Sequence, residues 1–213
     1  MSSSKDSCGD HGRRCERRRW WRRCIGYTLL FLFLVLLAIF ITWLVLRPTK
    51  PRFYLRHATV NQFNYSGPPS NLLSTVFQVT VSSRNPNDRI GVHYDRLEAY
   101  ASYRYQQITL RARLTPLYQG HNDVVLWSPV LFGPAIPIAP YLCDAIKGDV
   151  ASGFLQLSVR LEGRIRWSVG SWDSGRYRLF VDCPAFLTFQ NGVSTAEGAI
   201  VQFQQPSRCS VEV

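Results

Sequence analysis

The chain has 213 residues, with 25 lysine and arginine residues against 14 aspartate and glutamate residues, and its formal net charge at pH 7 is +11. This length leaves room for one membrane span and one further domain of ordinary size, and the aromatic content of 13% excludes the disordered, hydrophilic class of stress proteins. The charge alone would suggest a nucleic-acid partner, but eight of the basic residues precede a long apolar run and fit a juxtamembrane cluster that attracts anionic lipid, so no nucleic-acid partner is predicted.

The apolar run extends from Ile25 to Leu46 and contains no charged side chain. Its 22 residues would form a helix of about 33 Å, which is enough to cross a hydrocarbon core of about 30 Å. Such a run is either a leader that is cut away or a permanent anchor. A cleavable leader is shorter and ends in small residues, whereas this run is followed directly by arginine and proline. We therefore predict a basic tail over residues 1–23 and an uncleaved signal-anchor helix over residues 24–46.

The charges around the run predict its orientation, because lysine and arginine near a span resist translocation. Basic residues before the run outnumber those just after it, eight to four: Lys5, Arg13, Arg14, Arg17, Arg18, Arg19, Arg22 and Arg23 against Arg47, Lys50, Arg52 and Arg56. We expect a single-pass protein with its N-terminus in the cytoplasm, its tail against anionic lipid, and its C-terminal part in the secretory lumen or outside the cell.

The six cysteines divide into three on each predicted side of the membrane, where redox conditions differ. On the cytoplasmic side, Cys15 and Cys24 are candidates for palmitoylation, and the alternative is a plain free thiol. On the outer side lie Cys143, Cys183 and Cys209, an odd number. One pair with one leftover thiol is the simplest arrangement, and we favour a Cys183–Cys209 disulfide, with Cys143 buried or available to a partner.

Residues 47–71 are predicted to form a juxtamembrane linker and the first strand. They contain the sequon Asn64-Tyr65-Ser66 within a polar, proline-containing stretch that we expect to be a loop. A sequon on the outer side of a membrane is an acceptor for N-linked glycan, so we predict glycosylation of Asn64.

Beyond the linker the apolar residues alternate with polar ones, which is typical of strands with one buried face. In residues 155–167 the apolar side chains keep one parity through Gly163, which we expect to mark a bulge or a corner. The other strand candidates are 53–63, 77–83, 92–105, 107–114, 124–131, 177–183 and, weakly, 199–203, and a short helix is expected over 140–151. About seven or eight strands, most of them in residues 72–213, predict an antiparallel β-sandwich with one short helix.

Seven arginines lie on the polar parity of these strand candidates: Arg111, Arg113, Arg160, Arg164, Arg166, Arg176 and Arg178. If the strands are neighbours, these side chains form a basic face that would suit an acidic partner, whether anionic polysaccharide, lipid headgroups or an acidic protein patch. The alternative is a solvated sheet face whose charges guard against edge pairing.

The sequence contains no spacing that is typical of a catalytic or metal site. The four histidines are scattered, and there is no nucleophile elbow, phosphate-binding glycine loop or zinc-protease helix. Asn85, Pro86 and Asn87 follow a strand candidate and predict a strand exit, because proline lacks the ladder N–H and asparagine caps a turn. We predict a protein that is not an enzyme and that uses no cofactor and no metal.

A family resemblance rests on the basic tail, the single early span, a late cysteine and the segments "RNPNDRIGVHYD" and "EGRIRWSVGSWDSGRYRLFVDCP". Together they resemble the plant NHL proteins, named for non-race-specific disease resistance and harpin-induced proteins. The resemblance covers about residues 20–213 and implies an outer group-two late embryogenesis abundant domain, an immunoglobulin- or fibronectin III-like β-sandwich. It matches Asn85, Pro86 and Asn87 to the family's strand-exit signature and Cys183 to the cysteine after its last long strand. Cys143 departs from the family pattern and leaves the disulfide pairing open.

The resemblance also implies a function, that of a plant plasma-membrane protein tied to immunity, senescence or abiotic stress, without catalytic residues. We expect the sandwich to face the cell exterior and to act by contact in defence or stress signalling and in adhesion between membrane and cell wall. Expected partners are defence-signalling proteins or an acidic cell-wall polymer, and oligomerisation is left open. The alternative function is lipid binding or lipid transfer through an apolar cleft inside the tethered sandwich.

Overall fold

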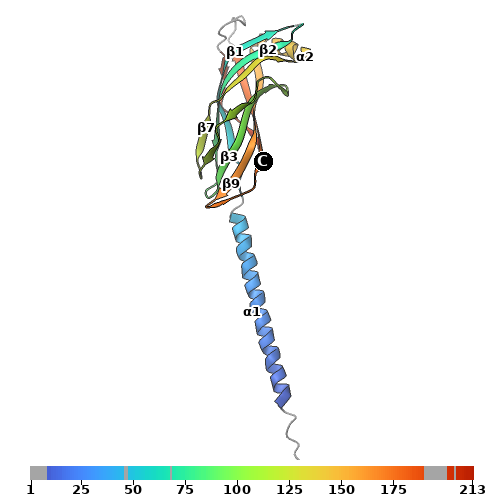
Figure 1. Ribbon diagram of the computed structural model, residues 1–213, viewed down its shortest axis with the longest axis vertical. Coiled ribbons are helices and arrows are strands. Elements are labelled where there is room, and N and C mark those ends of the chain that lie inside the picture. The colour runs from blue at the N-terminus through green and yellow to red at the C-terminus, as the bar shows by residue number, and fades with distance from the viewer. Residues whose placement is uncertain (1–8, 46–47, 68, 190–200, 204) are drawn as a thin grey trace, which may run out of the picture. The chain divides into compact units, whose positions relative to one another are not determined.

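The computed structural model describes residues 9–45, 48–67, 69–189, 201–203 and 205–213 (Figure 1). The chain divides into two compact units, Met1–Arg47 and Pro48–Val213. The first unit contains one long helix, and the second contains the strands and a short helix. The division between them falls next to the end of the apolar run.

The first unit is built around helix α1, Gly9–Val45. Its segment Trp20–Ile41 has 22 residues and is, within the described parts of the chain, the one helical stretch long and apolar enough to cross a membrane. Its apolar side chains are exposed on all sides, a pattern expected of lipid-facing residues rather than of core residues. The helix begins well before the predicted start at residue 24, because arginine and glutamate are good helix formers. The described part of the basic tail is therefore helical.

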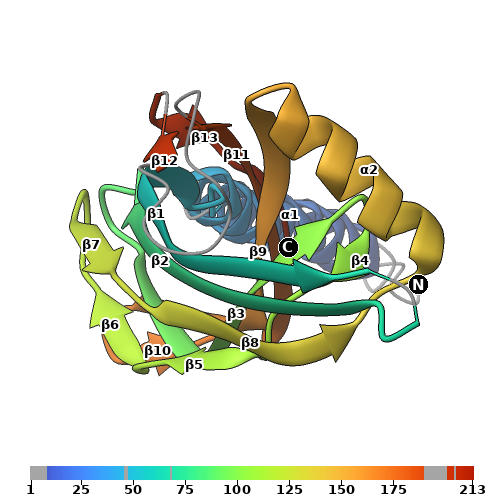
Figure 2. The same cartoon turned by 90° about the horizontal axis from the view of Figure 1, so that it is seen from above.

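One layer of the second unit is a five-stranded antiparallel sheet with the order β13-β1-β2-β7, in which β8 also pairs with β2 (Figure 2). Its centre is the long hairpin of β1 and β2. The strands are β1 (Arg52–Ser66), β2 (Leu72–Arg84), β7 (Val124–Trp127), β8 (Val130–Pro137) and β13 (Ser207–Arg208).

The other layer is a nine-stranded antiparallel sheet with the order β12-β11-β9-β3-β4. Four short strands join its long ones, since β10 pairs with β9, β14 with β11, and β5 and β6 with β3. Because β9 lies between β3 and β11, its outward side chains have neighbours on both sides. The strands are β3 (Gly91–Tyr103), β4 (Gln106–Gln107), β5 (Ala112–Leu114), β6 (Leu117–Gln119), β9 (Phe154–Val169), β10 (Trp172–Asp173), β11 (Tyr177–Phe189), β12 (Val201–Phe203) and β14 (Ser210–Glu212).

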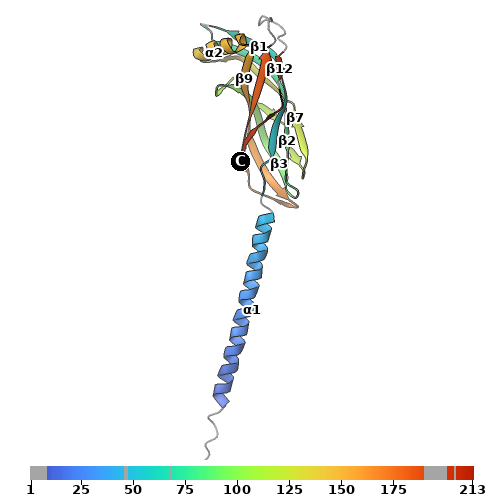
Figure 3. The same ribbon diagram turned by 180° about the vertical axis from the view of Figure 1, so that it is seen from behind.

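The hydrophobic core lies between the two layers. Inward side chains from all the long strands meet there and are almost fully buried, among them Leu55, Val81, Leu161 and Val181. Helix α2, Pro140–Ala151, follows β8 and lies at one end of the sandwich (Figure 3), where Leu142 and Ile146 are buried. The predicted antiparallel β-sandwich with one short helix is confirmed, and α2 covers the residues predicted for that helix.

The predicted strand over residues 107–114 is wrong in its middle, because the chain leaves the ladder between β4 and β5. Thr109, predicted to face outward, is fully buried, and its hydroxyl accepts the backbone N–H of Ala101 at 2.9 Å. Leu110, predicted to face the core, is 54% exposed, and its N–H donates to the carbonyl of Phe132 at 2.8 Å. These two hydrogen bonds outweigh the alternating pattern.

Two further strand predictions are corrected by backbone geometry. The stretch 124–131 forms two strands, β7 and β8, that are separated at Pro129, since proline has no N–H for the ladder. Strand β9 runs without interruption through Gly163, and the irregularity lies opposite, on β3 between Tyr94 and Arg96. A side chain at Gly163 would collide with the carbonyl of Arg96, so this glycine permits a close approach of β3.

The weak strand candidate over residues 199–203 is confirmed for Val201–Phe203, which forms β12 and pairs with β11. Residues 199 and 200 lie outside the described residues.

Candidate functional site

The Asn-Pro-Asn element lies directly after β2 and forms a polar cluster, the asparagine knot (Thr49, Asn85 and Asn87), in which the two asparagines are buried and Thr49 is exposed. Asn85 is fully buried, and its amide donates to the carbonyl oxygens of Ile90 at 2.7 Å and Gly120 at 2.9 Å. Its Oδ1 accepts the backbone N–H and the side-chain amide of Asn87, at 3.1 and 2.8 Å. Oδ1 of Asn87 accepts the N–H and the hydroxyl of Thr49, at 2.9 and 2.6 Å. The knot therefore ties the start of the second unit to the exit of β2.

The seven predicted arginines all reach the outer face of the nine-stranded sheet. Five lie in strands β5, β9 and β11, while Arg111 and Arg176 lie in loops beside them. The face is not purely basic, because carboxylates stand between the arginines: Asp95, Glu98, Glu162, Asp173 and Asp182. The face is therefore a mixed ion-pair network. What it can bind depends on the arginines that form no ion pair with a carboxylate of the domain.

Arg166 is fully committed to carboxylates of its own domain. Its Nε and Nη2 donate to both oxygens of Asp95, at 2.7 to 3.1 Å, and its Nη1 donates to Asp173 at 2.8 Å. Nε of Arg176 lies 3.4 Å from the same Asp95. Hydrogen bonding by Arg166 is the main reason that the pKa of Asp95 is held below its ordinary value.

A second paired cluster lies further along β9 at Glu162. Its carboxylate accepts the hydroxyl of Tyr100 at 2.5 Å and Nη1 of Arg111 at 2.6 Å. Burial alone would raise the pKa of Glu162, but these two hydrogen bonds outweigh it and lower that pKa. The guanidinium of Arg111 also lies 4.7 Å from the ring centroid of Tyr100. Arg113 approaches Glu98, with Nε 3.6 Å from Oε1.

Arg164 and Arg178 differ from the other arginines of this face. They stand directly opposite each other on β9 and β11, and Arg96 of β3 stands opposite Arg164 on its other side. Both side chains are exposed, and within the described part of the chain neither has an ion pair with a carboxylate. Like charges directly opposite in a sheet repel. Arg96 itself is paired, since its Nε donates to Oε1 of Glu98 at 3.1 Å. We call Arg164 and Arg178 the open arginine row, where a bound anion would relieve the repulsion.

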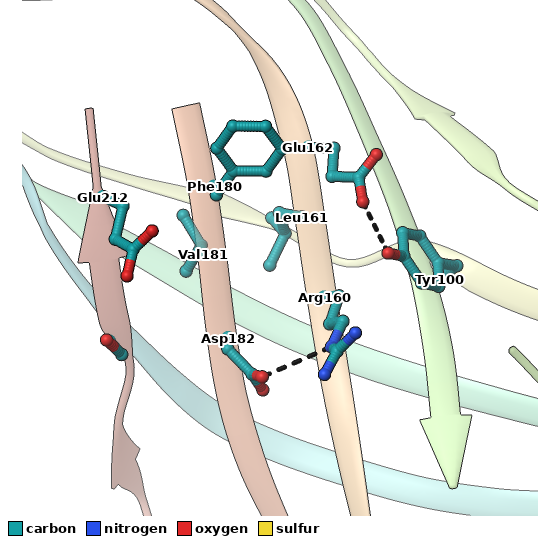
Figure 4. Close-up of a pocket in the computed structure, with 9 residues that line it drawn as sticks. Tyr100, Arg160, Leu161, Glu162, Phe180, Val181, Asp182 and Glu212 are labelled. Atoms are coloured by element: carbon teal, nitrogen blue, oxygen red, sulfur yellow. Dashed lines mark hydrogen bonds and ion pairs between the residues drawn. The ribbon is translucent and has the colours of Figure 1, made fainter. Parts of the chain in front are cut away.

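Three surface pockets lie along the outward side chains of β9, and together they form the β9 groove. The central pocket, of about 250 Å³, is shown in Figure 4, where Arg160 pairs with Asp182 and Glu162 with Tyr100 across neighbouring strands. It shares Arg160 and Asp182 with a pocket of about 440 Å³, and it shares Glu162 and Phe180 with a pocket of about 280 Å³ beside the open arginine row.

The groove follows β9 from Phe154 to Arg164. Ten steps of about 3.3 Å make this roughly 33 Å, which suits an extended chain rather than a compact small molecule. Within the described residues, no group of three or more histidine, cysteine, aspartate or glutamate side chains could hold a metal ion. The groove offers cations, carboxylates and exposed aromatic rings, which are the elements of a binding site for a polar chain.

The remaining predicted sites lie away from the groove. The Cys183–Cys209 disulfide is confirmed, with 4.2 Å between the two Cα atoms, and it joins β11 to the segment between β13 and β14. Cys143 is a buried free thiol on α2. Cys24 is half-buried on α1, and the side chain of Cys15 lies outside the described residues. Palmitoylation of these two cysteines stays a prediction.

The expected loop at Asn64 is wrong, because Asn64 lies within β1, opposite Ser74 of β2. The loop prediction relied on the prolines, which begin only after the strand ends at Ser66. The side chain of Asn64 is exposed, so the residue stays a candidate for glycosylation.

The carboxylates and aromatic rings of the groove were not predicted from the sequence. Glu162 carried a usable signal, because it shares the outward parity of Arg160 and Arg164 on β9. Asp95 carried none, since the irregularity of β3 between Tyr94 and Arg96 breaks the alternation at that position.

The fold and the groove define a class: a β-sandwich protein with a charged outer groove and an N-terminal helix long and apolar enough to cross a membrane. Residues 80–183 match the family model LEA_2, described as "Late embryogenesis abundant protein". The chain is 46% identical to NDR1/HIN1-like protein 1 of Arabidopsis thaliana, over 97% of this chain and 99% of that protein. It is 45% identical to NDR1/HIN1-like protein 12 of the same plant, over 99% and 100%.

The chain therefore belongs to the NDR1/HIN1-like family, with a LEA_2 domain. Among solved structures, a protein from Archaeoglobus fulgidus aligns with 64% of this chain and 98% of its own, at 9% identity and a TM-score of 0.30. That likeness is too weak to carry an argument.

Proposed function

We propose that this is a type II plasma-membrane protein whose β-sandwich faces the cell exterior and holds an acidic cell-wall polymer in the β9 groove, as a non-catalytic component of plant defence or stress responses. Membership of the NDR1/HIN1-like family with a LEA_2 domain supports the defence or stress role. The apolar segment Trp20–Ile41 supports a membrane anchor, and the excess of basic residues before it supports an N-terminus in the cytoplasm.

The observation that carries the binding proposal is the contrast between paired and open arginines on one face. Arg166 and Arg111 already hold carboxylates of the domain, so an added anion would have to displace them. Arg164 and Arg178 hold none that the described residues provide, and they lie side by side at one end of the groove. Guanidinium groups bind carboxylates in a bidentate fork, so a polymer with one carboxylate per sugar matches this end.

The binding test uses the full-length protein in nanodiscs of zwitterionic lipid, with polygalacturonate as the probe. We expect Arg164→Ala/Arg178→Ala to weaken binding about tenfold or more, because two direct charge contacts are lost. The matched control is Arg52→Ala/Arg84→Ala, since these exposed arginines also stand directly opposite each other but on β1 and β2. Equal losses in both variants, or no binding by the wild type, would overturn the proposal.

The topology test compares the wild type with Asn64→Gln in sealed microsomes. We expect glycosidase to shift the wild-type band but not the variant band, and the second unit to resist added protease. Digestion of that unit from the cytoplasmic side would reverse the proposed orientation.

Replacing Arg17, Arg18, Arg19, Arg22 and Arg23 by Ala should weaken insertion with the N-terminus inside.

The alternative of lipid binding between the sheets has no specific observation in its favour within the described residues. The three pockets of the β9 groove lie on the outside of the sandwich and are lined by charged side chains. Inward residues such as Leu55 and Leu161 are fully buried in the core.

The family membership motivates three further proposals: a defence-signalling protein as partner, adhesion between membrane and wall, and oligomerisation.

A further inference from the structure

The hairpin between β3 and β4 turns through two residues in an unusual backbone conformation. Tyr103 pairs with Gln106, so the loop consists of Arg104 and Tyr105, and both have positive φ, 44° and 71°. Two-residue loops of this kind favour Asn-Gly or Asp-Gly, because glycine and asparagine tolerate the left-handed region. Arginine and tyrosine are disfavoured there, and such strain is retained mainly where the surrounding structure holds it for a function.

Neighbouring side chains hold this turn in place without using Tyr105. The hydroxyl of Tyr103 donates to Oδ2 of Asp149 at 2.6 Å, and Nη2 of Arg104 lies 3.5 Å from Oδ1 of the same residue. The guanidinium of Arg104 also lies 5.3 Å from the ring centroid of Tyr103. Helix α2 supplies Asp149, so the turn is braced from outside the hairpin.

Tyr105 is left projecting from the braced turn. Its side chain is 87% exposed, and its ring centroid lies 5.6 Å from the guanidinium of Arg160. It lines the largest pocket of the β9 groove, of about 440 Å³, together with Phe154, which is 40% exposed and stacks on Phe186 at 6.1 Å between ring centroids. Two exposed rings therefore border one pocket.

The chemistry of this pocket fits a sugar better than a simple anion. A sugar ring has an apolar C–H face, which can lie on an aromatic ring, and hydroxyls, which need hydrogen-bonding groups at the rim. Tyr105 and Phe154 offer the rings, while Arg160, Asp149 and Gln156 offer donors and acceptors. A free phosphate or an anionic lipid headgroup would have no use for the two aromatic faces.

We propose that Tyr105 is a stacking platform for a sugar ring, and that the pocket around Tyr105, Phe154 and Arg160 is a sugar subsite of the β9 groove. This inference rests on the proposed polymer binding and makes the ligand more specific. The open arginine row, at the other end of the groove, binds carboxylates, whereas the Tyr105 subsite binds the apolar face of a sugar. Tyr105 lies beside Arg160, and Arg164 is four residues further along β9, roughly 13 Å away, so the ligand that reaches both sites is a polyuronate chain and not a single sugar.

The test uses the full-length protein in zwitterionic nanodiscs with long-chain polygalacturonate. We expect Tyr105→Ala to weaken binding about tenfold and Tyr105→Phe to keep it, because phenylalanine preserves the ring. Tyr105→Gly should also weaken binding while raising the melting temperature, because glycine tolerates the positive φ of 71° and the bracing by Arg104 is kept. This variant separates loss of the platform from loss of the fold. The control is Tyr141→Ala, since Tyr141 is a 69% exposed tyrosine on α2 that lines none of the three groove pockets.

The outcomes separate this inference from the proposed function. If Tyr105→Ala binds polygalacturonate as tightly as the wild type does, while Arg164→Ala/Arg178→Ala binds it weakly, the sugar subsite is overturned and the polymer proposal stays in place. Absence of binding by the wild type overturns both. If anionic vesicles bind as tightly as polygalacturonate and do so independently of Tyr105, the face recognises charge alone and the subsite is again overturned.

Discussion

The asparagine knot and the open arginine row are two polar regions of one domain, and they satisfy their polar groups in opposite ways. In the knot, Asn85 is fully buried and its side chain makes four hydrogen bonds inside the domain. In the row, Arg164 and Arg178 are exposed and face another arginine rather than a carboxylate. Burial makes an unpaired polar group costly, so the knot must be complete within the domain. Exposed guanidinium groups are solvated by water, so the row needs no partner within the domain and is open to an anionic ligand.

The pair of Arg166 and Asp95 stands between these two extremes. It is partly buried and bidentate, with its charges satisfied inside the domain. The knot, the pair and the row should therefore differ in the effect of removing their side chains. Removal from the knot should damage folding, removal from the pair should change its pH dependence, and removal from the row should change binding alone.

The largest expected loss of stability follows from Asn85→Ala in the knot. The change leaves the carbonyls of Ile90 and Gly120 and the N–H of Asn87 without their partner, so we expect the free energy of unfolding to fall by about 3–4 kcal/mol. Urea unfolding of the second unit measures it. The control is Asn61→Ala, an exposed asparagine on β1, with a change within about 0.5 kcal/mol. A similar small change for Asn85→Ala would contradict the structural role of the knot.

The next largest loss follows from removing the disulfide, which also acts within the buried part of the domain. The bond closes a loop between positions 26 apart, so Cys183→Ala/Cys209→Ala should lower the free energy of unfolding by about 3 kcal/mol. Reductant should destabilise the wild type and leave the variant unchanged. A non-reducing peptide map in which Cys143 is joined to Cys183 would show that the pairing is wrong.

The pair of Arg166 and Asp95 predicts a dependence of the free energy of unfolding on pH. The lowered pKa of Asp95 means that its ionised form stabilises the fold above the unfolded pKa of about 4 and that this contribution is lost as the pH falls through the folded pKa. Asp95→Asn should cost about 1 kcal/mol at pH 7 and progressively less as the pH falls through the folded pKa of Asp95, which flattens the acid limb of the stability curve. Asp144→Asn, at a 78% exposed carboxylate on α2, is the control. An unchanged acid limb in Asp95→Asn would argue against the ion pair.

The smallest effect on stability is expected in the open arginine row. Arg164→Ala/Arg178→Ala removes no hydrogen bond that the described residues make, so the free energy of unfolding should change by less than about 0.5 kcal/mol. Relief of cross-strand repulsion should make the change slightly favourable at low salt and absent at high salt. A loss above about 1 kcal/mol would move these arginines from the binding group to the structural group.

Local sequence patterns predicted much of this molecule, since they depend on neighbours along the chain. The parity of β9 and β11 brought the predicted arginines to one face, and α2 matches the predicted helix. The pairing of Arg166 with Asp95 could not be predicted, because the two residues are 71 positions apart and meet only through the register of β3 against β9. Thr109 is a similar case, since its burial depends on the N–H of Ala101 on the neighbouring strand.

The pairing of β1 with β13 has a consequence for the order of assembly in the cell. Tyr54 of the first strand pairs with Arg208, and the N–H of Cys209 donates to the carbonyl of Phe53 at 3.0 Å. About 150 positions separate these partners, and synthesis at about 5–20 residues per second takes roughly 10–30 s to cover them. The edge of the five-stranded sheet beside β1 therefore stays open during most of the domain's synthesis. In the proposed topology, a lumenal chaperone that covers exposed strand edges would act during this interval, before residues 207–209 arrive and close both the edge and the disulfide.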